Sequence, residues 1–139
     1  MFYEPEKDNH GLKRAPFKSC VVPRPIGWIS TMTAEGVPNL APYSQFTNLT
    51  YDPPYVMLSI NQSPKKGTRK DTAINIEATG EFVYNMCTYD LREKMNITAA
   101  EFDYGVDEFA AAGLEKAPSV LVKPFRVKES PIQFECAYV

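Results

Sequence analysis

A short basic segment is the clearest chemical feature of the sequence. Four basic residues and no acidic residue occur between positions 65 and 70, while the whole chain has 15 Lys and Arg against 17 Asp and Glu, so the remainder is acidic. An isolated group of cations suits a single phosphate better than the long basic surface that binds nucleic acid. The alternative is a solvated basic turn before an ordinary helix. The four residues are Lys65, Lys66, Arg69 and Lys70.

Hydroxyl and amide side chains gather in a second segment, just after Pro42. They are Ser44, Gln45, Thr47 and Asn48. Pro42 disturbs regular strand pairing, and a bulged strand can aim such groups at the polar edge of a ligand. The alternative is a polar strand end that enters a loop.

Three aromatic residues near these segments could stack on a flat ligand or shield it from water. They are Trp28, Tyr43 and Phe46. Aromatic side chains in strands are more often part of the hydrophobic core, so the core is the favoured interpretation. If Phe46 contributes to a site, we expect it to do so through its backbone.

The supply of reactive side chains excludes several kinds of catalysis. A single histidine, His10, argues against histidine-dependent metal or triad chemistry. Three widely spaced cysteines without a CxxC pattern argue against a disulfide framework or a zinc site, and we expect them to be structural. An enzyme of this composition needs a cofactor, and a reducing cytoplasm is its expected location. The cysteines are Cys20, Cys87 and Cys136.

Length and composition predict one domain that covers residues 1–139. No window approaches the roughly 18 apolar residues of a membrane span. The first ten residues have neither a basic start nor an apolar stretch, so a secretory signal is not expected.

Twelve prolines and seven glycines punctuate short apolar runs, which predicts a mainly β fold, a β-barrel with short helices. We expect a hairpin from 24–33 and 39–46, with Pro42 restricting the return to an edge strand, and a buried strand at 55–60. A helix at 70–80 should be capped by Asp71 or Thr68 and stopped by Gly80. The other predicted elements are strands at 81–87, 119–130 and 131–139 and helical segments at 91–95 and 107–114.

Several separated motifs resemble the flavin reductase-like family, which includes flavoredoxin. They occur in the family's order and the match covers about residues 10–139: HGL (10–12), VVPRPIGWIST (21–31), NLAPYSQF (39–46), DPPYVMLSI (52–60), KDTAINI (70–76) and TGEFVYN (79–85). The resemblance implies an FMN-binding split β-barrel that forms homodimers.

The resemblance also implies where FMN binds. Ser44, Gln45, Phe46, Thr47 and Asn48 would lie along the isoalloxazine ring, with Ser59 and Asn61 nearby, and Lys70, Asp71 and Thr72 would receive the phosphate. Hydride would pass directly from NAD(P)H to the flavin, so no catalytic acid or base is needed, and the electrons would reach a small molecule or free flavin.

Two other functions remain open on the sequence. One is a flavoredoxin-like electron carrier that has the flavin site but no nicotinamide site. The other is a cofactor-free barrel remnant that acts as an interaction module. The family's barrel normally continues beyond the strand matching 132–139, so we expect either that a partner subunit covers the exposed edge or that the chain is shortened, with weaker flavin binding.

Overall fold

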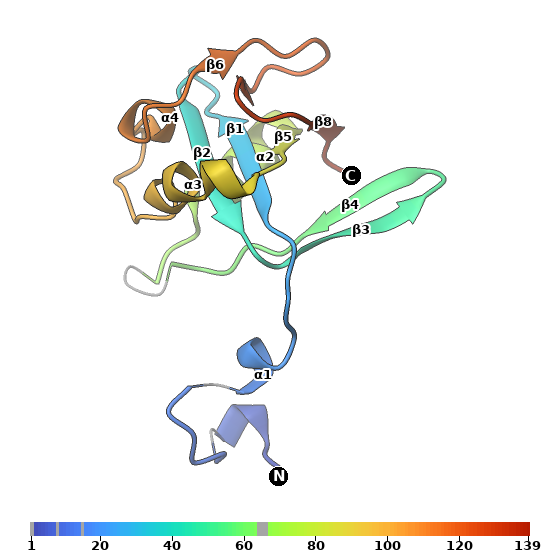
Figure 1. Cartoon of the computed structure of the whole chain (residues 1–139), viewed down its shortest axis with the longest axis vertical. Helices are drawn as coiled ribbons and strands as arrows, with labels where there is room; N and C mark the ends of the chain where they lie inside the picture. Colours follow the sequence, from blue (N-terminus) through green and yellow to red (C-terminus); the bar gives the residue numbers. More distant parts are fainter. Residues whose placement is uncertain (1, 8, 15, 64–66) are drawn as a thin grey trace.

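The computed structural model describes residues 2–7, 9–14, 16–63 and 67–139. Three parts are distinct in Figure 1: a body of strands and helices, a β-hairpin that projects from it, and an N-terminal arm below it. The arm holds the short helices η1 (Pro5–Lys7) and α1 (Pro16–Ser19). Most of the body is strand with short helices, as the composition predicted.

The body is built on a four-stranded antiparallel sheet. Its strand order is β2 (Pro38–Tyr43), β1 (Gly27–Met32), β5 (Glu81–Asn85) and β8 (Gln133–Ala137). The predicted first hairpin is confirmed, with Gly27 paired to Tyr43 and Met32 to Pro38. Pro42 lies on β2 at the edge of this sheet, where its missing N–H costs no ladder bond.

The predicted return strand at 39–46 is two strands. β2 ends at Tyr43, the chain bends at Ser44 and Gln45, and β3 (Phe46–Tyr51) pairs with β4 (Pro54–Leu58) in a separate two-stranded sheet. The prediction of a buried strand at 55–60 was wrong, because β4 lies in the projecting hairpin and most of its residues are exposed or half-buried. A continuous apolar run indicates a strand but not what covers it.

The helix predicted at 70–80 is α2 (Asp71–Thr79), and Gly80 ends it in the left-handed conformation at φ 73°. The Gly80 N–H donates to the Ile76 carbonyl at 2.7 Å, which closes the last turn. The predicted cap was wrong: Lys70 occupies the N-cap position and its side chain makes no capping hydrogen bond. The second helical region contains η2 (Tyr89–Leu91), α3 (Arg92–Ile97) and α4 (Glu108–Ala111).

The prediction of a long strand at 119–130 was also wrong. Only β6 (Lys116–Ala117) and β7 (Arg126–Val127) pair there. A turn separates them, and the Glu135 carboxylate accepts backbone N–H groups from Val120 and Leu121. The side chain therefore supplies acceptors that a neighbouring strand would otherwise provide.

Opposite faces of the sheet bury two separate cores. Trp28 packs with α4 and β7 on one face, and the next residue, Ile29, packs with α2 on the other. Alternation along a strand produces this arrangement. Trp28 is fully buried and donates its indole N–H to the Thr98 hydroxyl at 2.9 Å, so it belongs to the core, the interpretation favoured above. The core residues are Trp28, Leu40, Leu91, Phe109, Ala112, Leu114 and Val127 on one face and Ile29, Tyr43, Ile76 and Phe82 on the other.

Among the described residues, none of the helices is both long enough and apolar enough to reach across a lipid bilayer.

Candidate functional site

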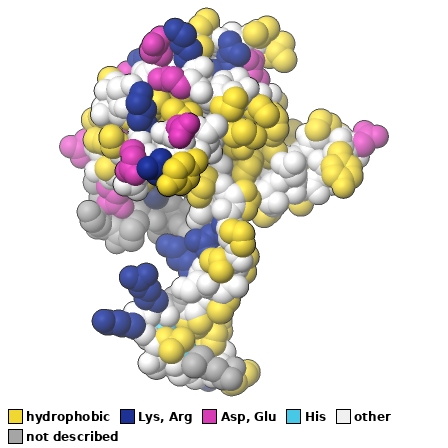
Figure 2. All heavy atoms as spheres, viewed as in Figure 1, with side chains coloured by type: hydrophobic (Ala, Val, Ile, Leu, Met, Phe, Trp, Pro, Cys, Tyr) yellow, Lys and Arg dark blue, Asp and Glu magenta, His cyan; other side chains and the backbone are white. Residues whose placement is uncertain are grey.

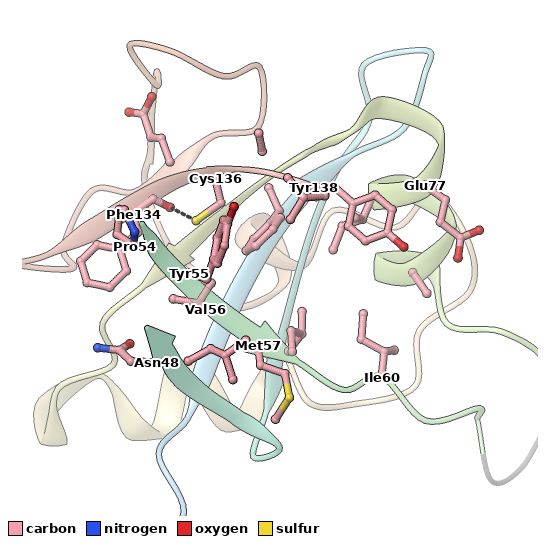
Figure 3. Close-up of a pocket in the computed structure, with 18 of the residues that line it drawn as sticks. Asn48, Pro54, Tyr55, Val56, Met57, Ile60, Glu77, Phe134, Cys136 and Tyr138 are labelled. Carbon is pink, nitrogen blue, oxygen red and sulfur yellow. Dashed lines mark hydrogen bonds between the residues drawn. The ribbon is translucent and has the colours of Figure 1, made fainter. Parts of the chain in front are cut away.

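A large open hollow lies where the β3–β4 hairpin leaves the body. Its volume is about 1370 Å³, and it is bounded by the hairpin, the end of β8 and α2. Figure 3 shows Tyr55, Phe134 and Tyr138 around it, with Asn48 and Glu77 at opposite sides. In Figure 2, hydrophobic side chains gather at this junction between hairpin and body.

The walls of the hollow are mainly apolar. One wall residue, Phe134, contacts the Tyr84 ring with ring centres 5.0 Å apart. Tyr84 in turn stacks on Phe46 at 4.7 Å, with the ring planes at 14°. Ligand sites commonly combine an apolar wall with a few polar groups that orient the ligand. The apolar wall residues are Val56, Leu58, Ile60, Ile76, Phe82 and Phe134.

Two cations lie at the α2 side of the hollow. Arg69 is ion-paired with Glu77, and both side chains are about half exposed. Lys70 lies with its Nζ 5.7 Å from the centre of the Tyr43 ring. Lys65 and Lys66, the other members of the basic segment, lie outside the described residues.

The first turn of α2 combines this lysine with a helix N-terminus. Lys70 has extended backbone dihedrals, so the helix begins with Asp71, and the Lys70 carbonyl accepts the N–H groups of Ala73 and Ile74. Helix N-termini attract anions through the N–H groups of their first turn and the helix dipole. The start of α2 is therefore suited to an anionic group of a ligand.

Thr72 differs from the expectation drawn from the resemblance. Its side chain is buried, and its hydroxyl accepts a hydrogen bond from the Tyr43 hydroxyl at 2.8 Å and donates to Asn39 Oδ1 at 3.0 Å. The hydroxyl is thus engaged inside the protein, and what Thr72 can offer a phosphate is its backbone N–H. Burial raises the pKa of Tyr43 to about 12.

The predicted polar segment is held by neighbouring chain. Arg24 Nε donates to the Ser44 hydroxyl at 3.2 Å, Asn61 Nδ2 donates to Gln45 Oε1 at 3.1 Å, and the Ser59 N–H donates to the Gln45 carbonyl at 2.9 Å. The segments at 44–48 and 59–61 therefore lie side by side.

Three of the ten predicted site residues, Asn48, Asn61 and Lys70, line the large hollow. Asp71 and Thr72 line a smaller polar cavity of about 90 Å³, which shares Arg69 and Lys70 with the hollow. Phe46 is buried and stacks on Tyr84. Four residues do not line either cavity: Ser44, Gln45, Thr47 and Ser59.

Sequence reasoning missed the aromatic residues of the hollow. Tyr55 was expected inside a buried strand, and nothing near Phe134 and Tyr138 in the sequence indicated a ligand. Arg24 was also missed, although it lies within the quoted motif VVPRPIGWIST and its Nη1 donates to the Lys18 and Val21 carbonyls. Among the described residues, no three His, Cys, Asp or Glu side chains are placed to hold a metal ion.

Glu108 is a further residue that the sequence did not single out. Its carboxylate is buried beside the smaller cavity and accepts hydrogen bonds from Asn39 Nδ2 and the Leu40 N–H, both at 2.9 Å. Burial is the main reason that its pKa is raised. An acidic residue followed by FAAAGL was the only sequence signal, and it is equally typical of a solvated helix end.

The chemistry of the hollow fits a flavin nucleotide. A flat aromatic ring matches the apolar wall, the amides of Asn48 and Asn61 can hydrogen-bond polar ring atoms, and Lys70 with the start of α2 suits a phosphate. Together, the hollow and the start of α2 beside it offer groups for each part of the ligand.

Comparison with known proteins agrees with this chemistry. A family model described as the flavin reductase like domain matches residues 19–139. An uncharacterized protein of Aquifex aeolicus (strain VF5) is 46% identical over 116 residues, which are 84% of this chain and 59% of that protein.

Solved structures show the same fold. The nitrilotriacetate monooxygenase component B from Bacillus cereus superposes with a TM-score of 0.84 at 32% identity and covers 94% of this chain and 65% of its own. A Shewanella frigidimarina protein described as having a split barrel domain gives a TM-score of 0.81 at 26% identity, over 100% of this chain and 69% of its own. The mainly β architecture is therefore that of a split barrel, as predicted. The chain spans less than two thirds of the length of the Aquifex and Bacillus proteins.

Proposed function

The chain belongs to the flavin reductase-like family, and from this premise we propose that it binds FMN and transfers reducing equivalents from NAD(P)H to a small acceptor or to free flavin. Membership of the family makes it a flavin-binding domain of the oxidoreductase kind. The choice of FMN, the nicotinamide donor and the acceptor are the parts that we propose.

One observation carries the proposal: Asn48, Asn61 and Lys70, from three separate segments, line the same hollow. A ring against the apolar wall would have the amides of Asn48 and Asn61 as candidate hydrogen-bond partners in the same hollow. The phosphate would lie toward Lys70 and the first N–H groups of α2, where a single dianion is electrostatically favoured.

Bound FMN would supply the redox chemistry, taking up a hydride from NAD(P)H and passing the electrons to the acceptor. The chain's own residues would bind the flavin, orient it and shield it from water. The apolar walls would shield the ring from water, the amides of Asn48 and Asn61 would orient it, and Lys70 would hold the phosphate. No side chain of the hollow is assigned an acid or base role, consistent with a protein that has a single histidine.

We also propose that the protein works as a homodimer in the cytoplasm. The hairpin exposes the large apolar side chains Leu49, Tyr51 and Met57, and an isolated two-stranded hairpin is marginally stable in water. Sedimentation velocity should show a dimer, and a monomer at all accessible concentrations would contradict it.

The central experiment is an absorbance spectrum of the purified protein under anaerobic conditions, before and after adding NADH or NADPH. We expect a flavin spectrum that bleaches with at least one nucleotide and returns when an acceptor is added. A colourless protein that fails to bind added FMN would contradict the proposal. Bleaching by a reduced redox protein but by neither nucleotide would favour the electron-carrier function.

A further inference from the structure

Glu108 begins a hydrogen-bonded chain that runs through the core of the protein. It lies on α4 with 5% of its surface exposed, and its carboxylate accepts from Asn39 Nδ2 and from the Leu40 N–H, both on β2. A carboxylate only accepts hydrogen bonds. It therefore determines that the NH2 group of Asn39, and not its carbonyl oxygen, points toward α4.

The orientation of the Asn39 amide in turn determines its hydrogen bonds to α2. With its NH2 group directed at Glu108, its Oδ1 is left to accept from the Thr72 hydroxyl at 3.0 Å and from the Thr31 hydroxyl at 3.1 Å. Because Thr72 uses its proton on Asn39, it accepts from Tyr43 at 2.8 Å. Thr31 in turn accepts from Asn75 Nδ2 at 3.0 Å, so α2 is bound to the chain at two of its residues.

The helix start borders a cavity, although Thr72 itself is only 1% exposed. The polar cavity of about 90 Å³ lies among Asn39, Lys70, Thr72 and Glu108. Dense packing fixes most buried elements within tenths of an ångström, but a void on one side removes those contacts. Beside this cavity, the hydrogen bonds through Asn39 and Thr72 help to hold the first turn of α2 in place.

We propose that Glu108 is a positioning residue for the phosphate end of the flavin site, acting through Asn39 and Thr72 on the first turn of α2 and on Lys70. This inference rests on the proposed function. Glu108 does not line the large hollow, and two side-chain hydrogen bonds, through Asn39, link it to Thr72 at the helix start. A third joins Thr72 to Tyr43 on β2.

The test compares binding of FMN with binding of riboflavin, which has the same ring but no phosphate. In Glu108→Gln, the new side chain has a single acceptor oxygen, but the Asn39 NH2 group and the Leu40 N–H both still donate toward it. We therefore expect the Asn39 amide to turn over, so that its NH2 group faces Thr31 and Thr72. We expect the dissociation constant for FMN to rise at least about fivefold, the equivalent of one hydrogen bond, while that for riboflavin changes less than about twofold.

A double variant tests the direction of the hydrogen bonds. The double variant combines Glu108→Gln with Asn39→Asp. Its new amide on α4 can donate to the new carboxylate on β2 and accept from the Leu40 N–H. The new carboxylate in turn accepts from the hydroxyls of Thr31 and Thr72. The net charge is that of the wild type, and we expect FMN affinity to return to within about twofold. Glu93→Gln, at a side chain 76% exposed on α3, is the control for loss of a carboxylate and should bind both ligands as the wild type does.

The outcomes separate cleanly. Equal weakening of FMN and riboflavin in Glu108→Gln, or an unchanged FMN affinity, overturns the positioning role. If Glu108→Gln does not fold, Thr72→Val removes the last link without touching the carboxylate, and the same phosphate-specific loss is expected or the inference fails. A wild-type protein that binds neither ligand overturns the proposed function, and this inference with it.

Discussion

Lys70 carries more of the proposed site than any other single residue. It precedes the first turn of α2, lines both the hollow and the smaller cavity, and lies beside the Tyr43 ring. Its neighbour Arg69 is already paired with Glu77. Of the two described cations in the basic segment, Lys70 is therefore the one whose charge is better placed to bind an anionic ligand.

Lys70→Glu should raise the dissociation constant for FMN at least about tenfold, because one charge-assisted contact to a phosphate contributes roughly 1.5 to 3 kcal/mol. Fluorescence titration of FMN measures the change. Lys7→Glu, in the N-terminal arm, is the matched control and should bind FMN as the wild type does. An unchanged affinity in Lys70→Glu would refute the assigned phosphate position.

Tyr43 makes stability depend on pH in the alkaline range. Burial raises its pKa from 10.0 in the unfolded chain to about 12 in the folded protein. Because the pKa is higher in the folded protein, the protonated hydroxyl adds to the free energy of unfolding. This contribution is complete below pH 10 and is lost as the pH rises through 12. The contribution is roughly 2 to 3 kcal/mol, since each unit of pKa difference between the folded and unfolded protein is equivalent to about 1.36 kcal/mol.

Urea unfolding of wild type and Tyr43→Phe between pH 9 and 12.5, a range set by these two pKa values, measures this contribution. The difference in unfolding free energy between the two proteins should narrow or reverse above pH 10, because only the wild type must deprotonate on unfolding. Parallel pH dependences would show that Tyr43 is not the group responsible.

At the scale of elements, close contact between β1 and β3 decides how the hairpin leaves the sheet. Gly27 begins β1, and a Cβ placed there would lie 2.7 Å from the Phe46 ring, which stacks on Tyr84 of β5. The glycine is needed for space and not for its backbone conformation. Phe46 thereby joins the first residue of the hairpin to the central sheet.

Gly27→Ala should lower the free energy of unfolding by about 1 to 3 kcal/mol, because the added methyl group must displace a ring packed between two strands. Chemical denaturation measures the loss. Adding Phe46→Leu removes the clashing ring atoms, so the double variant should lose less stability than the two single changes summed. Strict additivity would indicate that the two residues do not contact.

Helix α2 shows what local signals can and cannot predict. Its extent and its stop at Gly80 were predicted, since glycine in the left-handed conformation is a local property of the chain. The cap was wrong and the inward direction of the Thr72 hydroxyl was not anticipated. The direction of the hydroxyl depends on Tyr43 and Asn39, which are 29 and 33 positions away in sequence.

At the scale of the whole molecule, the parts differ in how well they are buried. The central strand β1 pairs on both sides and lies between two cores, whereas five of the six β3 residues are exposed. Segments with few buried contacts open at lower free energy than the core. The hairpin is also one wall of the proposed site, so its opening and ligand binding should be coupled.

Amide hydrogen exchange should show β3 and β4 exchanging much faster than β1 in the ligand-free protein. Saturating FMN should slow exchange in the hairpin and at the start of α2, because a ligand that binds only the closed form stabilises it. Exchange in the N-terminal arm serves as an internal control and should not respond to FMN. Equal protection of β1 and β3 without ligand would show that the hairpin does not open more readily than the central sheet.

The sequence by itself determined the mainly β fold, the first hairpin, the extent of α2 and the family, because these follow from residue types and spacings within short stretches of chain. Only the tertiary structure decided that β4 is exposed, that aromatic residues of β4 and β8 wall the hollow, and that Glu108 contacts β2. The contacts in question join residues as far apart as Asn39 and Glu108, 69 positions apart. No local pattern encodes such a contact, because it exists only once the sheet and its helices have brought the two segments together.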